Sequence, residues 1–486
     1  MTDSPEPPGA AGDPHYSPLL RTGLILTGTG TGGAYHAGVL RALQEAGVKI
    51  DIVGGNGVGV VGALFAAVDG AQRLWDEHGF WRAPAVRHLY PWRRLLSAAA
   101  GALAVSVAIV AVPLGAMVLG LAVYPVDFAA KLIGLTGADD WVGRYLRLTE
   151  DAFAPEGLPT WLPRLVVVVL GVFGLLAVCI AWFNAGGRRR RGPFWWRLVP
   201  APLSSAEAAT HSWHVMWDLV RGAAQLKQPS PAELSRRYIE MVSENLGQPG
   251  FRELVLAVHD LDARRDLVFA LVAESRRPGL YRRSTVEEGE ERRAEVFDLS
   301  GVAREYLAGA VAGALSLPVA TEATPVRFLP ETYWRGETHR LCDRPASVAR
   351  VLEELMALGA EQVLIVSAAS DTRSPHGLTP IRIDGRARLG EYLSSSEAAA
   401  VRDAMRLAAR PAVRLFTIRP QHNPIGPFDF GGGFDDRSDR PQPLDELMAH
   451  GYEDAYHQFI EPVVGASGEL LKVRSQKAKG KSEVRK

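Results

Sequence analysis

The chain of 486 residues has only two cysteines, Cys179 and Cys342, and they lie far apart. Two such cysteines predict neither a disulfide framework nor a zinc site, and they fit a reducing compartment for the soluble part. Net charge is also absent, because 54 basic residues balance 54 acidic ones. No overall electrostatic field would therefore steer the chain towards nucleic acid. The sequence has no internal repeat.

The two ends of the chain lack the composition of a packed core. Residues 1–20 are rich in proline, glycine and acidic residues and have no apolar segment, so we expect a flexible leader and no signal peptide. Residues 466–486 are rich in lysine and predict a basic, disordered tail. Such a tail usually only solvates, but beside a membrane it can hold anionic lipid.

Glycine, by contrast, is abundant near the start, where it forms two turns. The first, Gly28–Gly33, follows the apolar run Gly23–Leu26, and the second, Gly54–Gly59, follows Ile50–Val53. A helical pattern comes after each turn, so both predict strand–turn–helix units. Glycine permits positive φ and close backbone approach. Each helix would begin with unpaired N–H groups, which can hold an anion or an oxyanion.

The first turn fits G-x-G-x-x-G through Gly28, Gly30 and Gly33, so a dinucleotide-binding fold is one alternative. That fold places an acidic residue about 20 residues further on, at the C-terminal end of the second strand. Asp51 has roughly that spacing, but it opens its strand instead of closing it. The second glycine turn occupies the strand end, which makes the dinucleotide interpretation the weaker one.

The second turn has the frame of a nucleophile elbow, G-x-S-x-G, in which a strained strand-to-helix corner raises a serine above the sheet. Here the frame is Gly55–Gly59, and the serine position holds Gly57. Glycine has no side chain with which to attack a substrate.

At these residues the chain resembles the patatin-like lipid acyl hydrolases. Their first turn usually reads G-G-G-x-R-G, followed by A-Y-x-A-G-V-L, and here GTGTGG is followed by AYHAGVL at Ala34–Leu40. The resemblance covers 22–82 and, more loosely, 229–462. The serine of the family maps to Gly57 and its loop arginine to Gly32, so both chemically active residues of these motifs are missing.

The resemblance implies an α/β fold: a three-layer α/β/α sandwich with a mostly parallel central sheet. It also implies a serine–aspartate dyad for ester cleavage, without cofactor or metal. Backbone N–H groups of the first turn would hold the oxyanion. In this chain the oxyanion-hole residues are Gly28, Thr29, Gly30 and Gly33.

The aspartate of the dyad maps onto Asp343. An alanine-rich helix, 306–315, precedes it, and an amphipathic helix, 348–358, and a buried strand, 362–366, follow, as in the family. The next two residues, Arg344 and Pro345, differ from the glycine and small residue that the family has.

A second aspartate, Asp384, precedes Gly385 and looks more like the Asp-Gly pair of the family. It lies beyond the buried strand, however, where a turn is the expected role. The order of the elements therefore favours Asp343.

Two long uncharged stretches, Leu95–Val126 and Leu165–Gly187, interrupt the globular pattern. Each exceeds the roughly 20 apolar residues that a membrane span needs. The alternative is a buried core helix, which is rarely so long without a polar face. We therefore predict a two-helix transmembrane hairpin over 93–198, inserted between two parts of one patatin-like domain, 21–92 and 199–465.

The charges beside the two stretches predict their orientation. Arg93 and Arg94 precede the first stretch, the run Arg188–Arg191 follows the second, and acidic residues outnumber basic ones in the loop 127–164. By the positive-inside rule, both termini and the patatin-like domain would be cytoplasmic and the loop outside.

The departures at Gly57, Gly32 and Arg344–Pro345 predict a membrane-anchored pseudoenzyme that binds a membrane lipid, an acyl chain or a protein partner. Loss of the nucleophile from such a unit costs on the order of a millionfold in kcat. The alternative is an active lipid acyl hydrolase that uses a water over Gly57, activated by Asp343, or another route without serine.

Overall fold

The computed structural model describes residues 15–134, 141–152, 154, 158–184, 201–224, 226–281, 294–370, 385–408, 413–435 and 440–465. The chain divides into two compact units, and each is described on its own. The first contains Met1–Pro91 and Ser204–Lys486, and the second contains Trp92–Leu203.

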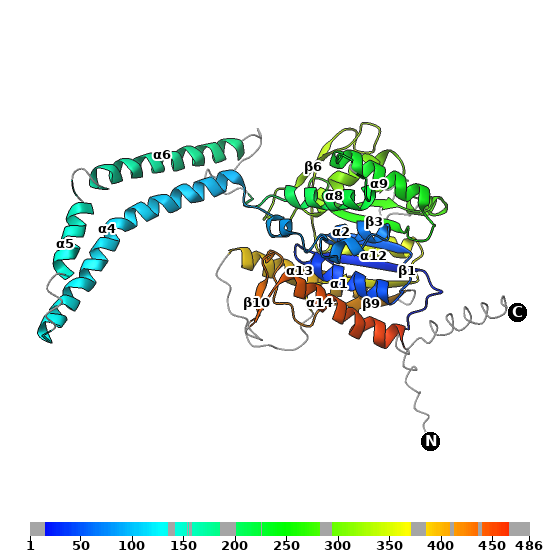
Figure 1. The fold of residues 1–486 in the computed structure, drawn as a ribbon. Coiled ribbons are helices and arrows are strands. Elements are labelled where there is room, and N and C mark those ends of the chain that lie inside the picture. Colours follow the sequence, from blue (N-terminus) through cyan, green and yellow to red (C-terminus); the bar gives the residue numbers. More distant parts are fainter. Residues whose placement is uncertain are drawn as a thin grey trace, which may run out of the picture. The chain divides into compact units, whose positions relative to one another are not determined.

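A central sheet organises the first unit (Figure 1). Among the described residues it has nine strands: β1 (Thr22–Gly28), β2 (Ile52–Gly57), β3 (Glu253–Asp260), β4 (Arg265–Leu271), β5 (Val296–Asp298), β6 (Thr324–Arg327), β7 (Thr338–Cys342), β8 (Gln362–Ser367) and β9 (Arg414–Ile418). The main order is β5-β4-β3-β2-β1-β8-β9, with β7 paired to β3 and β6.

The middle of this sheet is parallel. Strands β3, β2, β1, β8 and β9 pair side by side in the same direction, whereas β4, β6 and β7 join through antiparallel pairs. The buried central strands are apolar runs, as parallel strands covered on both faces require. The expected α/β class with a mostly parallel central sheet is therefore confirmed.

Helices cover the sheet: α1 (Gly32–Glu45), α2 (Gly59–Ala67), α3 (Gln72–Trp75), α8 (Ala206–Arg221), α9 (Pro231–Asn245), α10 (Arg277–Tyr281), α11 (Leu307–Ala314), α12 (Ser347–Ala357), α13 (Gly385–Ala408) and α14 (Leu444–Ala455). Short turns of helix are η1 (Pro84–His88), η2 (Glu274–Arg276), η3 (Val302–Tyr306) and η4 (Tyr456–Val464), and β10 (Gly433–Asp435) pairs with β11 (Arg440–Gln442).

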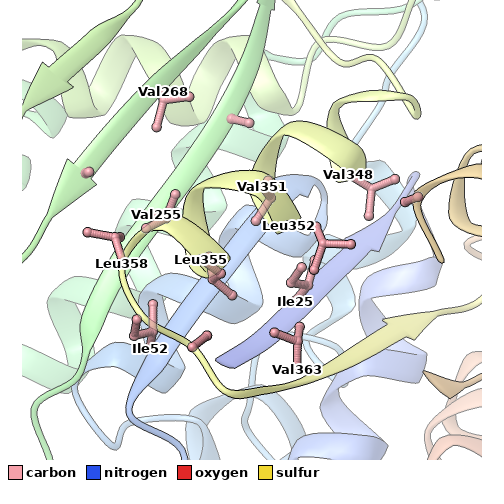
Figure 2. Packing of buried hydrophobic residues seen from close by; sticks show 14 of the residues in the cluster. Ile25, Ile52, Val255, Val268, Val348, Val351, Leu352, Leu355, Leu358 and Val363 are labelled. Atoms are coloured by element: carbon pink, nitrogen blue, oxygen red, sulfur yellow. The ribbon is translucent and has the colours of Figure 1, made fainter. Parts of the chain in front are cut away.

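The main hydrophobic cluster lies between α12 and one face of the sheet (Figure 2). Ile25 of β1 and Ile52 of β2 face Val351 and Leu355 of α12 there, and all four side chains are fully buried. The period of two along each strand places alternate residues on this face, and the helical period brings the α12 side chains onto one stripe.

Two glycines bring helices α1 and α14 into backbone contact. A Cβ on Gly38 would lie 1.8 Å from the Met448 carbonyl oxygen, and one on Gly451 would lie 2.2 Å from the Tyr35 carbonyl oxygen. Only glycine fits at either position. The contact holds the helix after the first glycine turn against the C-terminal part of the chain.

The leader predicted over 1–20 is shorter than expected. The Tyr16 ring is buried, and the Ser17 N–H donates to the Gln362 side chain at 3.1 Å, so the packed fold begins before residue 21. The composition of this segment, rich in proline, glycine and acidic residues, does not indicate that Tyr16 packs against the domain. Residues 1–14 and the predicted tail, 466–486, lie outside the described residues.

The second unit consists of α4 (Arg94–Leu132), α5 (Trp141–Ala152) and α6 (Leu158–Asn184). Helix α4 continues beyond 126, and α5 lies in the region expected to be a loop, 127–164. The amphipathic pattern of α5 lets its apolar side pack on α4, where the Tyr145 hydroxyl donates to the Ala116 carbonyl at 2.8 Å. The run Arg188–Arg191 lies outside the described residues.

One segment of the described residues, Leu114–Leu132, is long and apolar enough to cross a membrane. Arg94–Ala108 and Arg164–Ile180 are apolar but shorter. These criteria support one candidate span and do not support the second span of the predicted hairpin.

Candidate active site

The two glycine turns lie side by side at one edge of the sheet. Strands β1 and β2 are parallel neighbours, with Gly28 opposite Gly57, so both strands end at the same level. Strand β7 ends at Cys342, and Asp343 follows it. The Asp343 N–H donates to the Ser316 carbonyl at 2.8 Å, which fixes the start of this loop. Ligands of open α/β sheets bind at this carboxyl edge.

The structure brings Asp343 to the elbow. A Cβ on Gly57 would lie 2.9 and 3.0 Å from the two Asp343 carboxyl oxygens, which is where the base of a serine–aspartate dyad belongs. The φ of Gly57 is +57°, the left-handed conformation of a sharp corner. The same Cβ, however, would lie only 2.2 Å from the Gly28 carbonyl oxygen. Backbone therefore fills the space of a nucleophile side chain.

The Gly28 carbonyl also alters the predicted oxyanion hole. It accepts a hydrogen bond from the Val58 N–H at 2.8 Å. In a nucleophile elbow the N–H after the nucleophile is an oxyanion donor. Here that donor is occupied, and Gly28 contributes an acceptor to the site.

The other residues of the first turn are only partly available. The Gly33 N–H donates to the Gly30 carbonyl at 3.4 Å, and a Cβ on Gly33 would lie 2.1 Å from the Trp81 ring. Gly33 is thus a packing glycine and not an oxyanion donor. The motif predicted Gly33 as an oxyanion donor because the first N–H groups of a helix are usually free. Here the Gly33 N–H is used by the turn that leads into α1.

A segment from the C-terminal part covers the same turn. The Thr31 N–H donates to the Pro427 carbonyl at 3.1 Å, and the Thr31 hydroxyl donates to the Gly426 carbonyl at 2.8 Å. Within the described part of the chain, the N–H groups of Thr29 and Gly30 form no hydrogen bond. These two are the backbone donors left to hold a ligand oxygen.

Asp343 is buried and has few partners. The Thr29 hydroxyl donates to its Oδ2 at 3.3 Å, while Oδ1 has no partner among the described residues. Burial and, second to it, the nearby charge of Glu397 together raise the pKa of Asp343 to about 8. Asp343 is therefore mostly protonated at neutral pH, a state in which it cannot accept a proton.

Glu397 is the residue of this site that no motif identifies. It lies on α13, is buried, and accepts a hydrogen bond from the Ser367 hydroxyl at 2.5 Å. A Cβ on Gly28 would lie 3.6 Å from its Oε1, so Glu397 and Asp343 flank the glycine turn. Burial raises its pKa to about 7. The available signal is its position on the apolar stripe of α13, four residues after Leu393 and four before Val401.

His36 is buried beneath the turn. Its Nε2 donates to the Thr27 carbonyl at 2.9 Å, which leaves Nδ1 as an unprotonated acceptor. Burial lowers the pKa of His36 to about 4, so the imidazole is neutral. The described residues contain no group of three or more His, Cys, Asp or Glu side chains that could hold a metal. Asp384 lies outside the described residues.

The fold and these residues define a class, an α/β protein with the frame of a serine–carboxylate acyl hydrolase. A family model described as patatin-like phospholipase matches residues 24–146. Matches to curated patatin-like proteins agree with it, and part of the chain is similar to the patatin-like phospholipase family.

The matches to individual proteins are short. Patatin-like phospholipase domain-containing protein 6 of Mus musculus is 46% identical over 59 residues, which cover 12% of this chain and 4% of that protein. Lysophospholipase nte1 of Aspergillus fumigatus is 51% identical over 45 residues, covering 9% of this chain and 3% of that protein. The matched segments thus span a small fraction of these relatives. The crystal structure of VipD from Legionella pneumophila is 13% identical, covers 92% of this chain and 67% of that chain, and has a TM-score of 0.28.

Proposed function

We propose that the protein is a membrane-anchored patatin-like pseudoenzyme that binds a lipid or an acyl chain at the glycine turn and does not hydrolyse it. The observation that carries this proposal is the elbow. Gly57 offers no nucleophile, and the Gly28 carbonyl oxygen lies where a side chain would be, 2.2 Å from a Cβ. The binding frame remains, because Thr29 and Gly30 still offer N–H groups beside Asp343.

The state of Asp343 supports the loss of the reaction. A working base in a dyad is ionised at neutral pH and hydrogen-bonded to the hydroxyl that it activates. Asp343 instead has a pKa of about 8, and among the described residues its hydroxyl partner is Thr29, on the other turn. Arg344 next to it is turned towards Asp266, 3.5 Å away.

We further propose that α4 and α6 form a two-span hairpin with both termini and the patatin-like domain in the cytoplasm. In the described parts of both helices many apolar side chains are exposed, among them Leu121, Leu132, Val167 and Trp182. Exposed apolar surface of this extent fits lipid better than water. The shortfall of α6 is one of length, which local thinning of the bilayer and snorkelling of flanking side chains can accommodate.

An active hydrolase is the alternative, and Asp343 is again the residue that would carry it. A water held over Gly57 could lose its proton to the Asp343 carboxylate. Because the pKa of Asp343 is about 8, that route predicts ester hydrolysis that rises with pH up to about 8. The two functions therefore differ in turnover and in pH dependence.

Purified full-length protein in lipid nanodiscs tests the proposal. Short- and long-chain acyl esters measure turnover, and displacement of a fluorescent fatty acid measures binding. We expect binding without hydrolysis above the level of Asp343→Ala. Hydrolysis by the wild type that disappears in Asp343→Ala would instead establish the alternative.

Gly57→Ser provides a second comparison. The added side chain meets the Gly28 carbonyl, so we expect this variant to remain inactive. Activity restored by the serine would mean that the Gly28 peptide can turn away and that the rest of the apparatus is intact.

A further inference from the structure

Strand β7, which leads into Asp343, has a short backbone ladder to the rest of the sheet. In the described residues Leu341 and Cys342 pair with β3, and the Arg340 carbonyl accepts the Leu261 N–H at 2.9 Å. The other partner of β7, β6, is joined to the sheet through β7 itself. The position of β7, and of Asp343 after it, therefore depends on side chains that contact β3.

The buried ring of His339, in β7, lies between two carboxylates. Its Nδ1 lies 2.5 Å from Asp260 Oδ2, and its Nε2 lies 3.2 Å from Glu337 Oε2. The second oxygen of Asp260 accepts the backbone N–H groups of Asp262 and Ala263 at 2.9 and 3.1 Å. An ionised carboxylate only accepts hydrogen bonds, so both ring nitrogens of His339 donate and the ring is an imidazolium.

Aromatic rings and a separate ion pair complete the surroundings of His339. Phe328 and Trp334 flank it edge-on, with ring centroids 5.1 and 4.6 Å from that of His339. The other charged groups at this place, Asp262 and Arg340, bind each other, with Arg340 Nη2 2.6 Å from Asp262 Oδ1. The positive charge of the imidazolium is thus compensated by the two carboxylates that contact it.

We call the contact of His339 with Asp260 and Glu337 the histidine clasp. Burial lowers the pKa of His339, but the hydrogen bonds to the two carboxylates outweigh burial and hold the pKa above the ordinary histidine value of 6.5. The stability that the imidazolium contributes is therefore complete below pH 6.5 and is lost as the pH rises through this higher pKa. A neutral ring can donate to one carboxylate only, and it leaves the fully buried Asp260 without a counter-charge.

On the far side of Asp343, the chain is held by groups that keep their contacts over this pH range. The Ser347 hydroxyl donates to Asp266 Oδ1 at 3.0 Å, and Arg344 Nη1 lies 3.5 Å from Asp266 Oδ2. His259 Nδ1 also lies 2.8 Å from Asp266 Oδ1. Arginine stays charged and serine stays neutral, so their contacts do not need a proton on His259. Asp343 thus lies between a histidine contact that titrates and a contact that does not.

We propose that the histidine clasp is a pH-operated device that fixes β7 and, with it, the position of Asp343. With the clasp closed, Asp343 stays beside Gly57, as the structure has it. Loss of a proton from His339 loosens the start of β7, so that Asp343 gains freedom to leave the elbow at mildly alkaline pH. The clasp uses neither glycine turn, so it acts in the same way on a site that binds a ligand and on one that turns it over.

Hydrogen exchange of the full-length protein in lipid nanodiscs, followed by mass spectrometry from pH 6 to pH 9 and corrected for the intrinsic exchange rate, tests the clasp. The amides of β7 are compared with those of β8 in the same protein. His339→Gln keeps a donor for Asp260 but cannot titrate, and Glu337→Gln removes one carboxylate at a position that is 68% exposed. His214→Gln is the matched control, because His214 also lies near a carboxylate, 3.7 Å from that of Asp218, but its side chain is 56% exposed.

We expect the protection of the wild-type β7 amides to fall as the pH rises through the pKa of His339, by about tenfold for each unit by which the clasp raises that pKa. Asp343 loses its proton in the same range in all of these proteins. The fall should therefore be smaller in His339→Gln, should begin at a lower pH in Glu337→Gln, and should be unchanged in His214→Gln. An equal fall in the wild type and in His339→Gln, or a wild-type β7 whose protection does not change with pH, would overturn the proposal.

Discussion

The titration of Asp343 offers a test that does not depend on knowing the ligand. Replacing this residue, Asp343→Asn, keeps the size of the side chain and an acceptor for the Thr29 hydroxyl but removes the ionisable group. In the folded protein, burial raises the pKa of Asp343 from 3.8 to about 8, so the folded state retains a proton that the unfolded state releases. The stability contributed by this proton is complete below pH 3.8 and is lost as the pH rises through about 8.

The size of the effect follows from the shift in pKa. A shift of about 4 units corresponds to at most about 6 kcal/mol, at roughly 1.4 kcal/mol per unit. Glu397 titrates nearby, with a pKa of about 7, and shares part of this effect. We therefore expect Asp343→Asn to gain about 2–4 kcal/mol in unfolding free energy relative to the wild type between pH 5 and pH 9.

Denaturant unfolding of the detergent-solubilised full-length protein at pH 5, 7 and 9 measures this difference. At pH 5 the folded forms of both proteins are neutral at this position, and the difference between their midpoints there is the reference value. At pH 9 the variant should unfold at a clearly higher denaturant concentration. A difference that stays constant from pH 5 to pH 9, or that favours the wild type at pH 9, would refute the assigned state of Asp343 and restore it as a candidate base.

Four other changes give independent tests. Gly57→Ala should lower the unfolding free energy by about 2–4 kcal/mol, because the new Cβ is strained by the positive φ and clashes with the Gly28 carbonyl oxygen. The control is Gly47→Ala, which also has a positive φ but whose Cβ would meet open space. It should cost only about 1 kcal/mol in the same denaturation assay. Gly38→Ala should cost about 3 kcal/mol or more and should separate α1 from α14 in hydrogen exchange. Val319→Gly should raise the unfolding free energy by about 1 kcal/mol by relieving the strain of the positive φ, +67°, at this residue. Glu397→Gln removes a charge that raises the pKa of Asp343 in the folded protein. In that background, the gain in unfolding free energy produced by Asp343→Asn should be smaller and should level off at a lower pH.

The glycine turns were predictable from the sequence because few residues other than glycine fit their geometry. The left-handed φ of Gly57 and the close approach at Gly30 both require residues without a Cβ, and their spacing locates two strand ends. The order of elements around Asp343 placed it after a strand, and the structure sets it beside Gly57. The parallel centre of the sheet follows from the same strand–turn–helix units.

Other features depend on contacts that spacing does not encode. The Gly28 carbonyl points towards the elbow because of the orientation of a single peptide plane. The same glycine spacing is compatible with the opposite orientation, in which an N–H group would face the elbow. Glu397 reaches the site from α13, and Pro427 reaches it from a loop far along the chain. Tyr16 packs because of residues distant in sequence. The end of α4 and the presence of α5 were missed because charge was used to mark the limits of the apolar stretches.

Covalent trapping measures the central claim most directly, namely that the elbow has lost its attacking oxygen. Full-length protein in nanodiscs is treated with a long-chain alkyl fluorophosphonate, which modifies activated serine nucleophiles, and is analysed by intact-mass and peptide mass spectrometry. The account predicts an unmodified protein, indistinguishable from Asp343→Ala. A stoichiometric adduct in the wild type that is lost in Asp343→Ala would contradict it, because some hydroxyl would then be activated by Asp343.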